Sequence, residues 1–234
     1  MFAQLKQNSN EYETKYVFPN SNAYSLIQFL KSTCEKDGKY PEGTVSSIYY
    51  DTKDWKYISE KINSDYLKTK IRLRWYSDIN NIRPYNYSYA EVKYKVGSQR
   101  EKVRVKTPYS GKWLNTVDLE NSGLLQVPDL LREKGVRIKK NLHPVFQISY
   151  KRLRFIDIYS GSRICLDYDI SAPRVNGYML PRMNPFKLNT AVFELKGSIH
   201  DLPVSLKPLT IFGCRKASFS KYQACYQKVM NVTF

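Results

Sequence analysis

The chain has 234 residues, with 38 Lys and Arg against 21 Asp and Glu, so its formal net charge at pH 7 is +17. This charge indicates a polyanionic partner, namely nucleic acid, an anionic membrane surface or a phosphate-rich small molecule. Hydrophobic residues make up 42% of the chain, which argues against a disordered basic tail and favours one domain over residues 1–234 with a sizeable core.

The pattern of apolar residues predicts few helices. Four segments are expected to be helical: residues 22–35, a short stretch near 52–61, residues 128–134 and residues 218–231. In the first of them, Leu26, Phe29 and Leu30 fall on one face. Long irregular segments are expected at residues 77–88 and 171–190.

Most of the remaining chain alternates charged and apolar residues with a period of two, which indicates β-strands. The clearest example places Arg72 and Arg74 on one face and Leu73 and Trp75 on the other. Similar alternation occurs around residues 11–17, 91–96, 102–106, 150–155, 163–169 and 193–196, least cleanly at 150–155. The sequence therefore predicts a β-dominated protein with amphipathic antiparallel strands.

Lys and Arg dominate the charged faces of these strands. A solvated face normally mixes both signs, because like charges directly opposite each other across strands are destabilising. Each uncompensated pair costs about 1 kcal/mol in water and about 4 kcal/mol at an effective dielectric constant of 20. The strands therefore need an anion. If the sheet closes, its charged faces line the interior and its apolar faces lie outside, beneath the helices.

Two further features concern the cellular context. No apolar run approaches the roughly 20 residues of a membrane span, and residues 1–13 lack the apolar core of a secretion signal. Cys34, Cys165, Cys214 and Cys225 form no CxxC pair, and the chain has two histidines, so no zinc site of ordinary spacing is expected. We expect free thiols in a soluble, cytoplasmic protein, and a membrane or accessory partner stays open.

Taken in chain order, the strand motifs resemble those of a known family. The segment EYETKY at residues 11–16 resembles the ExExK signature of triphosphate tunnel metalloenzymes. Further motifs are similar to those of the catalytic domain of the vacuolar transporter chaperone (VTC) family, in the family's order: residues 47–52, 70–76, 91–95, 102–104, Pro144, 150–152, 163–167, 193–196 and 219–222. Each motif alone is weak, but their order over residues 11–222 is specific.

The resemblance implies an α+β, β-dominated fold, in which an antiparallel eight-stranded β-barrel forms a tunnel with a charged interior, flanked by a few helices. It implies a polyphosphate polymerase that transfers the γ-phosphate of ATP onto a growing inorganic polyphosphate chain and releases ADP. Its partners would be ATP and inorganic polyphosphate, and its cofactor would be Mn²⁺ or Mg²⁺.

The resemblance also implies roles for residues at matching motif positions. The cations at the transferred phosphate would be Lys15, Arg72, Arg74, Lys93 and Lys221. The other phosphate ligands would be Lys70, Lys102, Arg104, Tyr150, Arg152, Arg163, Lys196 and Ser220. Glu194, with Glu11 and Glu13, would hold the metal, because hard carboxylate oxygens suit Mg²⁺ and Mn²⁺.

Two other functions stay open. Glu11 and Glu13 match carboxylates that hydrolytic tunnel enzymes use for metal, so a metal-dependent triphosphatase on inorganic triphosphate, nucleotide or RNA 5′ ends is one alternative. Aromatic residues interleaved with cations also suit a non-enzymatic module that binds polyphosphate or single-stranded nucleic acid. Carboxylates on the cationic faces disfavour nucleic acid, because they repel its backbone. Asp167 and Asp169 are expected to orient Arg163 or its neighbours rather than bind metal.

Overall fold

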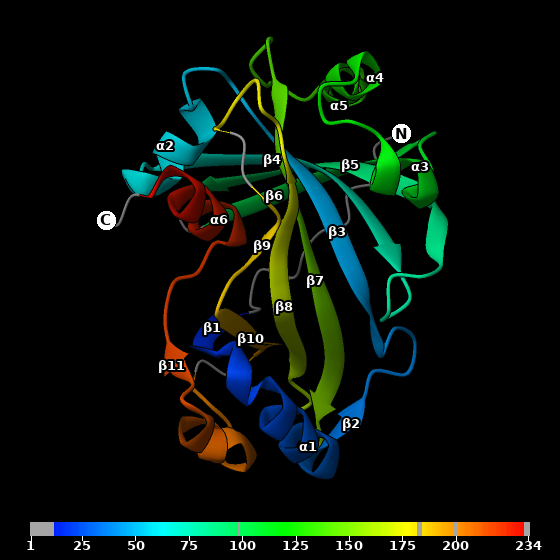
Figure 1. Cartoon of the computed structure of the whole chain (residues 1–234). Helices are drawn as coiled ribbons and strands as arrows, with labels where there is room; N and C mark the ends of the chain where they lie inside the picture. The colour runs from blue at the N-terminus through cyan, green and yellow to red at the C-terminus, as the bar shows by residue number, and fades with distance from the viewer. Residues whose placement is uncertain (1–11, 98, 182–183, 199–200, 232–234) are drawn as a thin grey trace. The chain divides into compact units, whose positions relative to one another are not determined.

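A computed structural model describes residues 12–97, 99–181, 184–198 and 201–231 (Figure 1). The strands are β1 (Tyr12–Pro19), β2 (Cys34–Lys36), β3 (Glu42–Asp51), β4 (Leu67–Ser77), β5 (Pro84–Val96), β6 (Gln99–Thr107), β7 (His143–Asp157), β8 (Arg163–Val175), β9 (Phe186–Lys187), β10 (Thr190–Gly197) and β11 (Arg215–Lys216). The helices are η1 (Asn20–Asn22), α1 (Ala23–Thr33), α2 (Lys56–Ile62), α3 (Gly111–Thr116), α4 (Ser122–Leu125), α5 (Val127–Arg132), η2 (Val204–Phe212) and α6 (Lys221–Met230), of which η1 and η2 are 3-10 helices.

The described strands form an 11-stranded antiparallel sheet in the order β11-β1-β10-β8-β7-β3-β4-β5-β6, with β2 paired to β7 and β9 to β8. The expected β-dominated α+β class is confirmed. Within the described residues, β2, β9 and β11 have only two or three residues each, so eight long strands remain. Among these residues, no helix combines the length and the apolar character that crossing a membrane requires.

The chain divides into two compact units, each assembled from three separate segments. The first unit draws on Met1–Glu42, Lys151–Asp169 and Asn189–Phe219, and the second on Gly43–Tyr150, Ile170–Leu188 and Ser220–Phe234. Strands β7 and β8 contribute residues to both units.

In the first unit, β1 pairs with β10 on one side and β11 on the other, and β10 pairs with β8. Helix α1 follows directly after β1 and η1. As the sequence predicts, Leu26 and Leu30 are fully buried, and the Phe29 ring lies 5.4 Å from that of Phe212 in η2. Helix α1 is therefore held by the apolar face that its sequence predicts.

In the second unit, β3, β4, β5 and β6 pair consecutively. One face of these strands is apolar and carries the core, which includes Ile48, Leu73 and Ala90. Short helices α3, α4 and α5 add Leu114, Leu124 and Leu131 to the same core. The core thus occupies the apolar face that the alternating sequence predicts and leaves the charged face on the opposite side.

Several expected elements differ from the structure. The predicted helices correspond to α1, α2, α5 and α6, but the prediction missed α3 and α4. Each missed helix begins after a capping residue: Ser110 accepts a hydrogen bond from the Trp113 amide, and Asn121 accepts one from the Gly123 amide.

The two expected irregular segments are partly wrong. Strand β5 begins at Pro84, so only residues 78–83 of the first segment lack strand structure. In the second segment, β8 continues to Val175, and Ser171 pairs with Lys187 of β9. The Arg174 side chain donates hydrogen bonds to Gln147 Oε1, which fixes the end of β8 through a contact between strands that no local pattern reveals.

Candidate functional site

Three rows of side chains cross β4, β5 and β6 on the face opposite the core of the second unit. They follow from the register of the strands: Lys70, Lys93 and Lys102 form the first row, Arg72, Glu91 and Arg104 the second, and Arg74, Tyr89 and Lys106 the third. Directly paired residues in an antiparallel sheet lie on the same face. The predicted common face of Arg72 and Arg74 is confirmed, and the register adds β5 and β6 to it.

A buried carboxylate lies at the centre of these rows. Glu91 is fully buried, and Arg72 donates to its Oε2 from Nε at 2.8 Å and from Nη2 at 2.7 Å. Lys102 Nζ lies 2.8 Å and Arg104 Nε 3.1 Å from Oε1, while Arg74 Nη1 lies 3.9 Å from Oε2. We call these five residues the Glu91 cluster. The alternation in the sequence predicts that Glu91 shares a face with the cations, but not that it lies at their centre.

The charge balance of the Glu91 cluster is strongly positive. Burial alone would raise the pKa of Glu91, but the charges of Arg72, Arg74 and Lys102 outweigh it and hold this pKa well below its ordinary range. Glu91 is therefore ionised. Because four cations surround one carboxylate, three positive charges are left unmatched within the cluster, and a multiply charged anion could neutralise them.

The start of helix α6 adds two more predicted residues to this part of the second unit. Lys70 Nζ donates a hydrogen bond to Ser220 Oγ at 3.1 Å, and Lys221 Nζ lies 4.5 Å from the centre of the Tyr150 ring. The Tyr150 hydroxyl in turn accepts a hydrogen bond from Arg74 Nη2 at 3.3 Å. Ser220, Lys221 and Tyr150 are thereby linked to the cationic rows.

A buried hydrogen bond fixes helix α6 in the second unit. The Tyr222 hydroxyl donates to Asp51 Oδ2 at 2.8 Å, and the Tyr222 ring stacks on Tyr49 with centroids 5.0 Å apart. Asp51 also accepts from the amides of Tyr57 and Ile58, both at 2.9 Å, at the start of α2, which lies beside α6 (Figure 1). Asp51 is a positioning residue that the sequence analysis did not single out.

In the first unit, β1 and β10 bring a second group of predicted residues together. Glu13 pairs in register with Lys196, and Lys15 pairs with Glu194. Lys15 Nζ lies 3.4 Å from Glu13 Oε1 and 3.2 Å from Glu194 Oε1, and Lys196 Nζ lies 3.8 Å from Oε2 of each glutamate. We call these four residues the Glu194 cluster.

Strand β7 adds an arginine next to the Glu194 cluster. Arg152 donates from Nε and Nη2 to the two oxygens of buried Asp167, at 2.6 and 2.7 Å, and its Nη2 lies 4.0 Å from Glu194 Oε2. Asp167 thus orients Arg152, whereas the sequence predicted that it orients Arg163 or its neighbours. Asp169 forms an ion pair with Lys151 at 3.0 Å, and Arg163 pairs in register with Lys196.

The predicted site residues fall into two sets. The second unit contains Lys70, Arg72, Arg74, Lys93, Lys102, Arg104, Tyr150, Ser220 and Lys221. The first unit contains Glu13, Lys15, Arg152, Arg163, Glu194 and Lys196. Glu11 lies outside the described residues. Their roles toward phosphate and metal stay predictions.

The Glu194 cluster fits a divalent metal that takes part of its coordination from a substrate. Glu13 and Glu194 have side chains only 15% and 11% exposed, and Lys15 connects them. Among the described residues, no group of three or more His, Cys, Asp and Glu side chains is arranged to hold a metal. Mg²⁺ is usually held by one or two carboxylates together with substrate phosphates, and two glutamates suffice for that arrangement.

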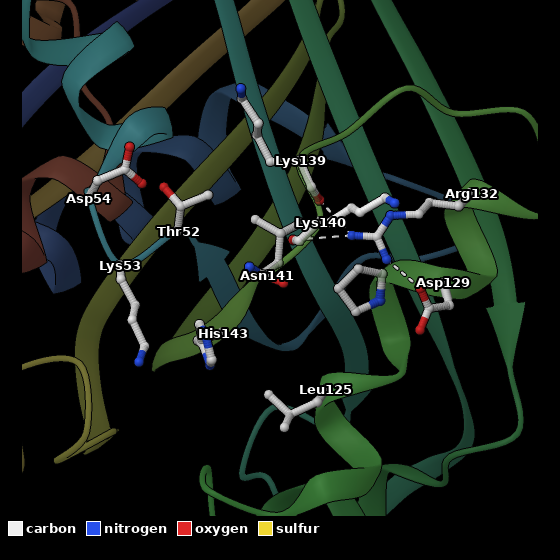
Figure 2. A pocket seen from close by; sticks show the side chains of 12 residues that line it. Thr52, Lys53, Asp54, Leu125, Asp129, Arg132, Lys139, Lys140, Asn141 and His143 are labelled. Carbon is white, nitrogen blue, oxygen red and sulfur yellow. Dashed lines mark hydrogen bonds and ion pairs between the residues drawn. The ribbon is translucent and has the colours of Figure 1, made fainter.

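A cavity of about 870 Å³ lies elsewhere in the second unit (Figure 2). Its lining includes Lys53, His143 and Leu125, and none of the predicted site residues. Arg132 donates hydrogen bonds to Asp129 and to the carbonyl oxygen of Lys140 at its edge, so it ties α5 to the following loop (Figure 2). The cavity is therefore separate from the Glu91 cluster.

Comparisons with known proteins agree with the sequence motifs. The family model described as the VTC domain matches residues 10–230. A solved structure of a putative adenylate cyclase from Bacillus halodurans has a TM-score of 0.51 at 14% identity, covering 90% of this chain and 95% of its own. A second, of a putative adenylate cyclase from Vibrio parahaemolyticus, has a TM-score of 0.47 at 13% identity, covering 97% and 100%. The first likeness shows a common fold alone, and no curated protein matches the chain.

Proposed function

The chain belongs to the VTC domain family, and from this premise we propose that it is a polyphosphate polymerase that uses ATP and a divalent metal. The main support is the Glu91 cluster, in which Arg72, Arg74, Lys102 and Arg104 surround one carboxylate. A phosphate chain carries the multiple negative charges that this excess of cations requires.

The proposal includes closure of the sheet into a tunnel with the charged faces inside. Arginine forks would bind phosphate oxygens in pairs, whereas lysines would supply point charges that tolerate movement of the chain. This combination suits a product that must advance by one phosphate in each cycle.

Phosphoryl transfer requires alignment and charge stabilisation more than covalent work by the protein. In the proposed reaction, a terminal oxygen of the polyphosphate forms a bond to the γ-phosphorus of ATP. The bond from that phosphorus to the β,γ-bridging oxygen breaks, and this oxygen leaves with ADP. Arg72 and Arg74, held by Glu91, would orient the transferring group, and Lys221 would neutralise charge beside it.

Glu194 and Glu13 are the residues proposed to hold the metal. Bound there, Mg²⁺ or Mn²⁺ would neutralise negative charge on the substrate phosphates. Lys15 and Lys196, which contact both glutamates, would reduce the repulsion between the two carboxylates. Arg152, fixed by Asp167, would present its guanidinium to phosphate at the same place.

Hydrolysis of a triphosphate is the second candidate function. The pairing of Glu13 with Glu194 through Lys15 favours it, because hydrolytic tunnel enzymes use carboxylates at the position of Glu13 to hold metal. Both reactions attack the same phosphorus. They differ in whether a polyphosphate end or a water molecule is the nucleophile.

Product analysis separates these reactions. The protein is incubated with ATP and Mn²⁺ or Mg²⁺, polymer is resolved on a gel stained for polyphosphate, and ADP and free phosphate are quantified. Long polymer matched to ADP, with little free phosphate, supports the polymerase. Free phosphate equal to ADP without polymer identifies the hydrolase. Tight polyphosphate binding with no turnover would assign the chain to the binding modules.

A further inference from the structure

The charged face of β5 changes its chemistry along the strand. From Lys93 and Glu91 toward the start of the strand, every second residue is a tyrosine: Tyr89, Tyr87 and Tyr85. The ring centroids of Tyr85 and Tyr87 are 5.5 Å apart, and those of Tyr87 and Tyr89 are 5.6 Å apart. We call these three residues the tyrosine ladder. It extends the face of the Glu91 cluster with contiguous aromatic surface.

Arg104 joins the tyrosine ladder to the Glu91 cluster. Its guanidinium carbon lies 3.6 Å from the centre of the Tyr89 ring, while its Nε lies 3.1 Å from Glu91 Oε1. Its Nη2 also donates to the Tyr76 hydroxyl at 3.0 Å. The guanidinium is thus held against an aromatic ring beside the cationic rows, and a guanidinium is a planar cationic group.

Part of this surface is accessible. Tyr85 is 40% exposed and the Arg104 side chain 36%, while Tyr87 and Tyr89 are half-buried. Aromatic faces carry negative electrostatic potential, so they offer little to a bare phosphate chain. Nucleobases, in contrast, stack on tyrosine rings and on arginine planes.

We propose that the tyrosine ladder and Arg104 form a nucleobase-binding platform, which makes the site select nucleoside triphosphates over inorganic triphosphate. This inference rests on the proposed function in one respect, since the triphosphate must occupy the Glu91 cluster. Arg104 would then contact both parts of the nucleotide, stacking on the base and pairing with phosphate. Along β5, the base would lie on the side of Tyr89 that leads to Tyr87 and Tyr85. The phosphates would lie on the other side, at Lys93 and at the cations around Glu91.

The test compares the affinities for ATP and for inorganic tripolyphosphate by calorimetry with Mg²⁺. The double variant Tyr85→Leu/Tyr87→Leu keeps bulk on the strand but removes two rings. We expect it to bind ATP at least fivefold more weakly, since stacking is worth about 1–3 kcal/mol per base, and tripolyphosphate within twofold of the wild type. The variant Tyr87→Phe, which keeps the ring, should retain both affinities.

The matched control is Tyr24→Leu, which removes a tyrosine that is 74% exposed on α1 of the first unit, and it should leave both affinities unchanged. Unchanged ATP affinity in the double variant would overturn the platform, and so would equal losses for both ligands. Retained tripolyphosphate binding shows that the variant is folded.

Two further outcomes test the proposed function and the binding of nucleic acid. A wild-type protein that binds neither ligand would refute the proposed function and the platform together. The same proteins are also titrated with a single-stranded oligodeoxynucleotide that lacks a 5′-triphosphate. If the double variant loses tight, salt-sensitive oligonucleotide binding while ATP affinity stays constant, the tyrosine ladder serves nucleic acid and the platform is wrong.

Discussion

Arg72 and Glu91 lie opposite each other on β4 and β5, and Nε and Nη2 of Arg72 both reach the same carboxylate oxygen, at 2.8 and 2.7 Å. This arrangement leaves Glu91 Oε1 to Lys102 and Arg104. One carboxylate therefore serves cations from both neighbouring strands. The protein thus supplies one of the negative charges that the cationic face requires. The positive charge that Glu91 does not neutralise is available to a ligand.

Substitution Glu91→Gln should destabilise the protein and make its stability depend on added anion. The amide keeps the size of the side chain but leaves four neighbouring cations without their shared counterion. Removing one partner of a buried ion pair costs about 3–5 kcal/mol. Thermal unfolding with and without tripolyphosphate measures the effect, and the ligand should raise Tm more in the variant than in the wild type. An unchanged Tm in the absence of ligand would contradict this role of Glu91.

The same carboxylate should make stability sensitive to acid. Because the pKa of Glu91 is far below its ordinary value of 4.5 in the folded protein, the unfolded chain binds the proton more readily. Stability from this group is fully present above pH 4.5 and is lost as the pH falls below it toward the folded-state pKa.

Denaturant unfolding of the wild type and Glu91→Gln over this pH range isolates the contribution. Asp51 acts in the opposite direction, because burial raises its pKa despite its hydrogen bonds, but it is common to both proteins. We expect the stability difference between the two proteins to shrink as the pH falls. A constant difference would show that Glu91 does not titrate as described.

Lys93→Ala and Arg72→Ala should separate binding from stability. Lys93 is exposed, whereas Arg72 is buried against Glu91. We expect Lys93→Ala to weaken ATP binding about tenfold or more, as loss of a charge-assisted phosphate contact implies, with unfolding free energy changed by less than about 0.5 kcal/mol. Arg72→Ala should lower both the affinity for ATP and the free energy of unfolding. If both variants turn over ATP like the wild type, the assignment of this face to the substrate is lost.

Glu194→Gln should affect metal dependence more than nucleotide affinity. The substitution removes one of the two charges proposed to hold the metal, whereas the cations of the Glu91 cluster are unchanged. Initial rates against Mn²⁺ concentration, together with the Kd for ATP, measure the two effects. We expect the rate to fall at least tenfold with Kd within threefold, since loss of a residue that only supports a metal ligand already costs about 10–100-fold. Wild-type activity that is equal with and without metal would contradict the assignment.

The faces of the strands could be predicted because alternation is local. Leu73 lies in the core and Arg72 on the opposite face, as the period of two requires. The role of Glu91 could not be predicted in the same way. It depends on the register that places residue 91 between Arg72 and Arg104, and register comes from pairing between strands that are separate in sequence.

The missed elements have related explanations. In residues 84–88 of the segment predicted to be irregular, tyrosines occupy the face that carries charge elsewhere, so the alternation of charged and apolar residues that indicates a strand is absent. At the end of β8, the hydrogen bonds of the Arg174 side chain to Gln147 and to the carbonyl oxygen of Leu114 are contacts that the sequence of residues 171–175 does not reveal. Contacts between distant residues decided both cases.

The passage of β7 and β8 through both compact units has a consequence for how the protein reaches its native state. Neither unit can be released as a continuous fragment by a single cut, because each needs segments from across the sequence. Tyr12–Pro19 must also find Thr190–Gly197 before β1 and β10 can pair. Loops of this size are costly to close, so folding should be slow compared with a helical protein of the same length, and unpaired strand edges should stay exposed during synthesis.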